Sequence, residues 1–185
     1  MSQDIFDSEV IDRCQYPEYR YLMFMLPIVL NARIIVETGL GVGLSTVIFL
    51  EACRFLDACK LYTYEININK EDTLKARKRI AELGLTNWWT LIEKDSVEGG
   101  KEWNRGKIDI LYLDSCHDTQ HVYNELKAWE PHVRDGGVIF SHDSFPSIPV
   151  PETAKPLEAF KRYAKEKNYR VINLKTPQGM CFLIR

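Results

Sequence analysis

The sequence has no excess of charge of one sign and no long apolar run. Its formal net charge is −2 over 185 residues, which gives no electrostatic reason to expect a nucleic-acid partner. The most apolar early segment, YLMFMLPIVL, contains a proline and is too short to cross a bilayer. The N-terminal segment MSQDIFDSEV is acidic and lacks the apolar centre of a signal peptide. We therefore expect a cytoplasmic protein that binds neither membrane nor nucleic acid.

Cysteine is present but lacks the pairing of a disulfide or zinc framework. The five cysteines form an odd set, and no two of them make a CxxC pair. This pattern favours reduced thiols, as in cytosolic proteins. Cys116 is expected to be a small residue packed at a strand end rather than a nucleophile.

Short apolar segments alternate with segments of helical length along most of the chain. Such alternation indicates crossover units and a mostly parallel sheet, which defines the α/β class. The last two segments are separated by TPQG and predict a hairpin that adds at least one antiparallel strand. We expect strands at 33–38, 60–66, 88–94, 108–114, 136–142, 169–175 and 180–185, and helices at 17–31, 44–56, 70–84, 119–133 and 152–168, with a short helix within 96–106.

The organisation predicted for residues 1–185 is a single domain without repeats or a linker. Residues 1–32 form an N-terminal helical extension and residues 33–185 the α/β core. A proline-rich loop, SFPSIPVPETAKP, follows the fifth strand. In an open α/β sheet, ligands bind outside the carboxyl ends of the strands. The residues that end each strand are therefore the candidates for a site.

The first strand runs into VETGLGVGLST, which places Gly39, Gly41 and Gly43 at alternate positions before a helix. Glycines there allow a tight turn and also let a ligand approach the backbone, and the helix N-terminus that follows suits anionic groups. The dinucleotide fingerprint G-x-G-x-x-G needs a further glycine at position 44 or 46, where the chain has leucine and threonine. The loop therefore predicts a ligand site that is not the dinucleotide fingerprint.

Acidic residues end the next two strands. Glu65 follows the loop by just over twenty residues, where an acid can accept both hydroxyls of a ribose. Asp95 and Ser96 end the third strand, and either could instead cap the following helix.

The fourth and fifth strands end in YLDSCH and GGVIFSHDS. Asp114, His117, His142 and Asp143 should therefore meet at neighbouring strand tips, where buried polar groups are costly unless they are used. His121 lies one helical turn beyond His117, and we interpret it as an exposed helix residue rather than a metal ligand.

The pattern E-x-G-x-G-x-G resembles the nucleotide loop of the class I S-adenosylmethionine-dependent methyltransferases. The resemblance implies a Rossmann-like doubly wound sheet of about seven mostly parallel strands with a C-terminal antiparallel hairpin strand. In that family the loop wraps the methionine end and the ribose of the cofactor, and an acid after the third strand bonds the adenine. The residues that the resemblance assigns to S-adenosylmethionine are Glu37, Thr38, Gly39, Gly41, Gly43, Ser45, Thr46, Glu65, Ile66, Asp95, Ser96 and Asp114.

The last two strand ends are similar to those of the catechol O-methyltransferase-like and sugar or antibiotic-tailoring O-methyltransferase branch. That likeness implies a divalent metal, magnesium or another, at Asp114, His142 and Asp143, with His117 as the general base. The chain differs from the branch in one respect, because an adjacent His-Asp pair replaces the usual acidic or amide residues. Imidazole suits zinc, manganese or iron better than magnesium.

The function expected from this resemblance is O-methylation of a small-molecule hydroxyl. Phe145, Ile148 and Val150 of the proline-rich loop are candidates for an apolar wall of the acceptor pocket. The short N-terminal extension leaves the pocket open unless a second subunit of a homodimer completes it. Two alternatives remain: an NAD(P)-dependent oxidoreductase using the Tyr123 and Lys127 spacing, and a non-catalytic module that binds S-adenosylmethionine.

Overall fold

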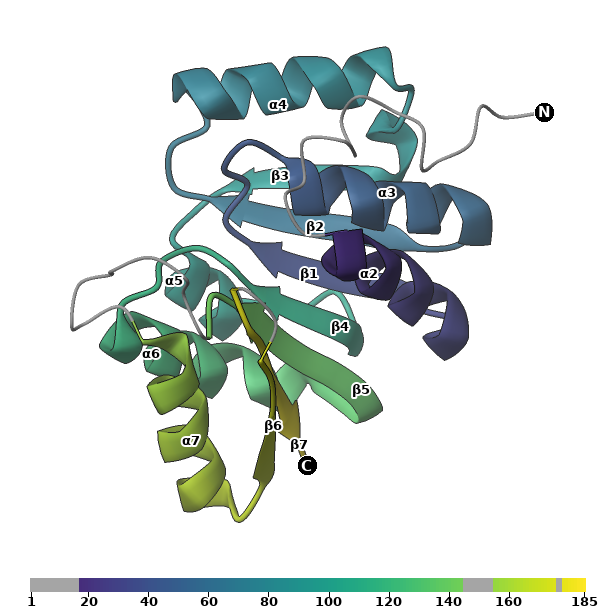
Figure 1. The fold of residues 1–185 in the computed structure, drawn as a ribbon. Helices are drawn as coiled ribbons and strands as arrows, with labels where there is room; N and C mark the ends of the chain where they lie inside the picture. Colours follow the sequence, from purple (N-terminus) through teal and green to yellow (C-terminus); the bar gives the residue numbers. More distant parts are fainter. Residues whose placement is uncertain (1–16, 145–154, 176–177) are drawn as a thin grey trace.

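A seven-stranded sheet lies between two layers of helices in the computed structural model, which describes residues 17–144, 155–175 and 178–185 (Figure 1). The strand order is β3-β2-β1-β4-β5-β7-β6. Strands β1 to β5 pair with one another in parallel, and β7 is antiparallel to both of its neighbours, β5 and β6. The strands are β1 (Ile34–Thr38), β2 (Lys60–Glu65), β3 (Trp89–Glu93), β4 (Ile108–Leu113), β5 (Val133–His142), β6 (Arg170–Leu174) and β7 (Met180–Ile184). The helices are α2 (Pro17–Leu30), α3 (Leu44–Leu56), α4 (Glu71–Glu82), α5 (Ser96–Lys101), α6 (Thr119–Trp129) and α7 (Pro156–Lys167), with short 3₁₀ turns η1 (Thr86–Trp88) and η2 (Glu130–His132).

The expected α/β class, the seven strands and the antiparallel hairpin strand are confirmed. The position of the hairpin in the sheet was not predicted from the sequence: β7 inserts between β5 and β6. Strand β5 begins at Val133, earlier than expected. Val133 pairs with Ile108, and a register shift then makes Val138 the partner of Ile110. The candidate wall residues Phe145, Ile148 and Val150 lie outside the described residues.

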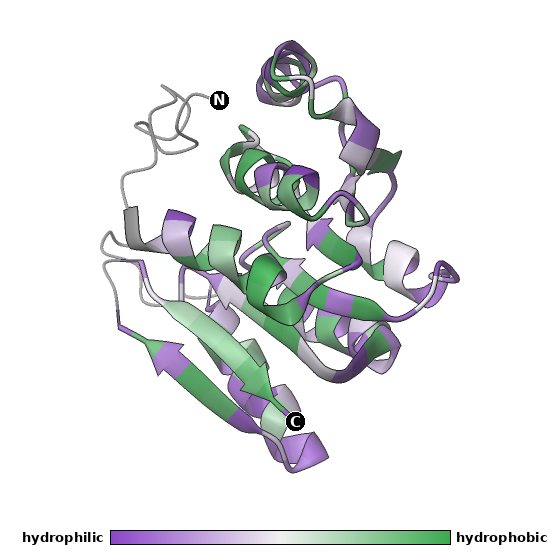
Figure 2. Ribbon diagram, turned by 90° about the vertical axis from the view of Figure 1, so that its right-hand side faces the viewer, coloured by the Kyte–Doolittle hydropathy of each residue, from purple (hydrophilic) through white to green (hydrophobic). Residues whose placement is uncertain are grey.

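The two helical layers cover opposite faces of the sheet. Helices α2, α3 and α4 lie on one face, and α5, α6 and α7 lie on the other (Figure 1). Each face has its own apolar core, one centred on Phe49 and Tyr112 and the other on Trp129 and Phe160. Figure 2 shows hydrophobic stretches interrupted by hydrophilic residues in the strands, and hydrophilic residues among hydrophobic ones in the helices. Because both faces of the sheet are covered, β4 is buried along all of its length and appears in the sequence as an apolar run interrupted by Asp109.

Backbone hydrogen bonds bring the carboxyl ends of the central strands together. The N–H of Gly39 donates to the carbonyl of Tyr64 at 2.7 Å, and the N–H of Asp114 donates to the carbonyl of Thr38 at 2.9 Å. The loop after β1 is therefore held between the ends of β2 and β4, next to the polar residues that follow β4. Among the described residues, no helix is long and apolar enough to cross a membrane.

Candidate functional site

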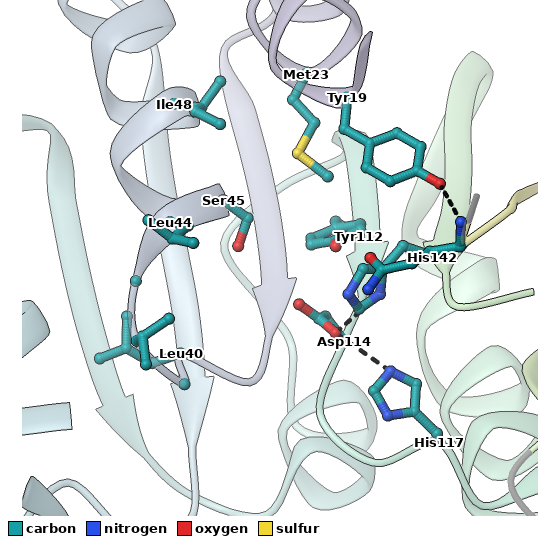
Figure 3. A pocket seen from close by; sticks show the side chains of 14 residues that line it. Tyr19, Met23, Leu40, Leu44, Ser45, Ile48, Tyr112, Asp114, His117 and His142 are labelled. Atoms are coloured by element: carbon teal, nitrogen blue, oxygen red, sulfur yellow. Dashed lines mark hydrogen bonds and ion pairs between the residues drawn. The ribbon is translucent and has the colours of Figure 1, made fainter. Parts of the chain in front are cut away.

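A cavity of about 430 Å³ opens at the carboxyl ends of β1, β4 and β5. The loop and first turn of α3, from Leu40 to Ser45, form one wall, and helix α2 contributes to another (Figure 3). The opposite side holds Asp114, His117 and His142, whose side chains point toward one another in Figure 3. The lining residues are Tyr19, Met23, Leu40, Gly41, Val42, Gly43, Leu44, Ser45, Ile48, Tyr112, Asp114, His117, His142 and Gln178.

The three glycines of the loop all have positive φ, and their surroundings differ. A Cβ added to Gly39 would lie 2.3 Å from the carbonyl oxygen of Asp114, so this glycine allows the loop to pack against the end of β4. A Cβ at Gly43 would lie 2.8 Å from Cβ of Ala76 on α4. Gly41 has no atom within 4 Å of that position. Gly39 and Gly43 therefore serve packing, and Gly41 is the glycine that leaves room for a ligand.

Glu37 lies beneath the loop, not in the cavity. Its side chain is wholly buried and accepts hydrogen bonds from Ser45 Oγ at 2.6 Å, Thr46 Oγ1 at 2.7 Å and Thr63 Oγ1 at 2.9 Å. Burial raises the pKa of this carboxyl to about 7, although the three hydroxyl donors act in the opposite direction. The direct cofactor contact expected for Glu37 does not fit this burial. The carboxyl instead ties β1 and β2 to the first turn of α3.

The other predicted cofactor residues fall into three groups. Gly41, Gly43, Ser45 and Asp114 line the cavity. The Thr38 and Thr46 side chains are buried and, like Gly39, lie outside its lining. Glu65, Ile66, Asp95 and Ser96 lie at the ends of β2 and β3, also outside that lining.

The residues at the ends of β2 and β3 are engaged in hydrogen bonds, apart from the exposed Ile66. Glu65 accepts from the backbone N–H groups of Leu40 at 3.1 Å and Asn67 at 3.0 Å. Asp95 caps α5 by accepting from the N–H groups of its first turn, which is the helix-cap alternative considered for this residue. A ribose or adenine contact by Glu65 or Asp95 stays a prediction.

The acid and the two histidines at the ends of β4 and β5 form a tight cluster. Oδ1 of Asp114 lies 3.5 Å from Nε2 of His117 and 3.2 Å from Nδ1 of His142. One ligand atom from each of these residues lies within 4.8 Å of the others, a spacing that a metal ion could bridge. The predicted ligands Asp114 and His142 are thus brought together, and His117 joins them.

Asp143 approaches the same cluster from a strained backbone position. Its φ of 55° is left-handed, a region that non-glycine residues rarely adopt. Its Oδ2 lies 3.2 Å from Nε2 of His117 and 3.6 Å from Nε2 of His142. Interaction with Asp114 is the largest cause that raises the pKa of His117, and the charge of Asp143 adds to it while burial opposes it.

Eight of the residues that line the cavity were not identified from the sequence, namely Tyr19, Met23, Leu40, Val42, Leu44, Ile48, Tyr112 and Gln178. Tyr112 lies two positions before Asp114 on β4, so the alternation of the strand could have placed both on one face. Burial holds the pKa of the Tyr112 hydroxyl well above its usual range, and the negative charge of the nearby Asp114 acts in the same direction. Tyr19 and Met23 of α2 and Gln178 before β7 carry no comparable signal in the sequence.

His121 is not the exposed residue expected. Its Nε2 lies 3.1 Å from Ser96 Oγ and 3.2 Å from Ser115 Oγ, and Ser115 also donates to the buried Glu125 at 2.7 Å. The network joins the ends of β3 and β4 to α6. It therefore holds the segment that follows Asp114.

The tyrosine and lysine of the oxidoreductase alternative lie away from the cavity. The hydroxyl of Tyr123 on α6 donates to Glu166 on α7, and Lys127 lies over the Tyr123 ring. Neither residue lines the cavity. This placement removes the sequence feature that favoured an oxidoreductase.

Comparisons with known proteins agree with this geometry. A family model described as "Methyltransferase domain" matches residues 36–144, more than half of the chain. No curated protein matches the sequence.

Solved structures share the fold at low sequence identity. A protein described as a caffeoyl-CoA O-methyltransferase from Staphylococcus aureus has a TM-score of 0.73 and 17% identity, over 91% of this chain and 83% of that one. The O-methyltransferase TomG from Streptomyces achromogenes, in complex with SAM, has a TM-score of 0.71 and 16% identity, over 94% and 82%. An O-methyltransferase from Bacillus cereus, in complex with SAH, has a TM-score of 0.71 and 16% identity, over 92% and 82%.

Proposed function

Because the chain belongs to the methyltransferase domain family, we propose that it transfers a methyl group from S-adenosylmethionine to a hydroxyl of a small molecule. One observation carries this proposal. The glycine loop and the Asp114–His117–His142 cluster face each other across one cavity, so a donor held by the loop would lie beside groups that can activate an acceptor (Figure 3).

The cofactor part of the proposal is supported by the start of α3. The N-cap of this helix is Gly43, which has no side chain to satisfy the first N–H groups. The hydroxyls of Ser45 and Thr46 are directed to Glu37. The free N–H groups and the positive end of the helix dipole would suit the carboxylate of the methionine moiety. Structural neighbours bound to SAM or SAH support the same choice of cofactor.

S-adenosylmethionine, when bound, supplies an electrophilic methyl group that is transferred by in-line displacement. The task of the protein is therefore to position the two reactants and to help the acceptor lose its proton. The loop from Leu40 to Ser45 would position the donor, and the Asp114 cluster would hold the acceptor hydroxyl. The placement of one domain over residues 1–185, with an extension at 1–32 and a core at 33–185, is part of this proposal.

The two roles expected at the cluster, general base and metal site, both involve Nε2 of His117. His117 is the expected base, and a divalent ion is expected at Asp114, His142 and Asp143. Nε2 of His117, however, lies among the atoms that could hold the ion. Methyl transfer to oxygen is compatible with either role of His117, because an ion at the cluster would lower the pKa of a bound hydroxyl.

The acceptor that the cavity favours is small and carries no negative charge. Within the part of the chain that the structure describes, no lysine or arginine lines the cavity. Apolar side chains from α2 and α3, namely Met23, Leu44 and Ile48, lie beside the hydroxyl of Tyr112 and the two imidazoles. A neutral hydroxyl compound with an apolar body suits this lining. The homodimer that would complete the pocket stays a prediction.

Calorimetric titration with S-adenosylmethionine tests the cofactor assignment directly. We expect one site with micromolar affinity, together with release of S-adenosylhomocysteine when hydroxylated acceptors are supplied. NAD(H) is the matched control ligand and is expected not to bind. Binding of NAD(H) without S-adenosylmethionine would overturn the proposal. Cofactor binding without transfer to any acceptor would favour the non-catalytic module instead.

Tyr112→Phe tests whether the cluster does the chemistry. Tyr112 and Asp114 line the same cavity, and loss of a polar group beside a site's ligands typically reduces activity roughly 10- to 100-fold. We expect this fall in turnover with little change in S-adenosylmethionine affinity. Tyr62→Phe is the control, because Tyr62 packs against Trp103 within the other core. Equal turnover in wild type and Tyr112→Phe would contradict the role given to the cluster.

A further inference from the structure

The cluster beside the cavity contains two imidazole nitrogens that lack a hydrogen-bond partner. Nε2 of His117 and Nδ1 of His142 are both buried, and neither makes a hydrogen bond of good geometry within the residues that the structure describes. Each lies 3.2 Å from a carboxylate oxygen, Oδ2 of Asp143 for His117 and Oδ1 of Asp114 for His142. A buried polar atom without a partner costs about 1–3 kcal/mol, so two such atoms a few ångströms apart need an explanation. Both lie near the same oxygen, Oδ1 of Asp114 (Figure 3).

A cation between these three atoms would satisfy all of them. Imidazole nitrogen and carboxylate oxygen are electron-pair donors, and their mutual separation within 4.8 Å fits ligands around one ion. The neighbouring carboxylate of Asp143 adds negative charge, which favours an ion at this position.

The donor set does not fit magnesium. Mg²⁺ prefers oxygen ligands in octahedral geometry, whereas imidazole suits zinc, iron and nickel. We infer that the cluster binds a first-row transition-metal ion such as Zn²⁺ or Fe²⁺ in preference to Mg²⁺, through Asp114 Oδ1, His117 Nε2 and His142 Nδ1. The metal assignment itself does not depend on the proposed function. Only the role of the ion in activating an acceptor hydroxyl rests on the proposed methyl transfer.

The assignment changes the roles of two residues named from the sequence. His117 is a ligand, so its Nε2 lone pair is not available to accept the acceptor's proton while the ion is bound. Asp143 is not one of the three assigned ligands, and its Oδ2 lies 3.2 Å from Nε2 of His117 and 3.6 Å from Nε2 of His142, the ring nitrogen opposite to the ligating one. A carboxylate behind a ligating histidine orients the ring and increases its basicity. The left-handed backbone at Asp143 directs its carboxylate toward that ring.

Titration of the chelator-treated protein with metal alone tests the inference. We expect one Zn²⁺ site by calorimetry and, with Co²⁺ as a spectroscopic substitute, visible absorption bands that Zn²⁺ displaces. Mg²⁺ is expected to bind at least about 100-fold more weakly. His117→Gln and His142→Gln should each weaken Zn²⁺ binding by more than about 100-fold, above the loss typical of outer residues.

Three controls separate this site from others. His132→Gln changes a histidine of η2 outside the cluster, and Cys116→Ser removes a thiol next to the cluster that is exposed rather than packed as expected, so both should keep the Zn²⁺ site. Circular dichroism of each variant excludes loss of the fold. Asp143→Asn should weaken Zn²⁺ binding by about 10- to 100-fold, less than the histidine variants.

The results that would overturn the inference differ from those that would overturn the proposed function. Equal binding of Mg²⁺ and Zn²⁺, or a Zn²⁺ site that survives His117→Gln, would remove the assigned ligand set. Absence of any metal site in a protein that binds S-adenosylmethionine would remove the metal and leave the methyltransferase proposal intact. A Zn²⁺ site in a protein that does not bind S-adenosylmethionine would support the metal site and remove the methyltransferase proposal.

Discussion

Gly39→Ala is expected to destabilise the protein by roughly 3 kcal/mol or more, because two penalties combine. A left-handed φ, here 86°, costs a non-glycine residue about 1–2 kcal/mol. Overpacking adds about 1–3 kcal/mol, and the new Cβ would lie 2.3 Å from the carbonyl oxygen of Asp114. That oxygen belongs to the backbone and cannot move away without displacing the end of β4. Urea-induced unfolding monitored by circular dichroism measures the loss.

Gly41→Ala is the matched control, and we expect it to cost less stability than Gly39→Ala and to lower the affinity for S-adenosylmethionine. Its φ of 50° also carries the left-handed penalty, but no atom lies within 4 Å of its added Cβ. We expect a stability loss of about 1–2 kcal/mol from the backbone alone. The methyl group should instead enter the space proposed for the cofactor and lower S-adenosylmethionine affinity by at least about tenfold, or about 1.4 kcal/mol. Equal stability losses in the two variants would contradict the distinction between a packing glycine and a ligand-facing glycine.

Glu37→Gln is expected to change how the stability of the protein depends on pH. The pKa of Glu37 in the folded protein, about 7, is raised above its ordinary value of 4.5 by burial. Folding is therefore penalised progressively as the pH rises from about 4.5 to 7, because the carboxyl ionises in the unfolded chain while the buried carboxyl stays protonated. The full penalty above pH 7 is on the order of 3 kcal/mol. Glutamine cannot ionise and can keep the contacts to the surrounding hydroxyls, so the variant should not lose this stability.

Unfolding free energies of both proteins between pH 4.5 and 8 measure the effect. The advantage of Glu37→Gln over wild type should grow up to about pH 7 and then become constant. Glu82→Gln is the control, because the Glu82 side chain is 65% exposed and its substitution should leave the pH profile nearly unchanged. A difference between Glu37→Gln and wild type that is the same at every pH would contradict the raised pKa.

The local pattern of the sequence was sufficient to predict the helices and strands because each depends on short-range features. Helix α3 has the predicted bounds, since the glycine loop sets its start and its apolar residues have helical spacing. Buried parallel strands such as β4, IDILYL, appear as nearly continuous apolar runs, so the polar residues that follow them are easily recognised. The carboxyl-end rule for α/β sheets then indicated the edge of the sheet that holds the cavity.

The roles of individual residues at that edge of the sheet could not be predicted, because they depend on how neighbouring strand ends and helices pack. Gly39 and Gly41 have the same sequence context, and only the close approach of β4 distinguishes them. Glu37 could be expected at a ligand because it ends a strand, but the packing of α3 over it buries the carboxyl.

The sequence by itself determined the α/β class, the family resemblance and the strand-end residues that could carry chemistry, since these follow from periodicity and spacing along the chain. Only the tertiary structure decided that β7 inserts between β5 and β6, that α2 contributes to the cavity, and that Glu37 is buried beneath the glycine loop. These outcomes depend on contacts between residues far apart in the chain. Such contacts follow from how whole elements pack, and no local pattern encodes them.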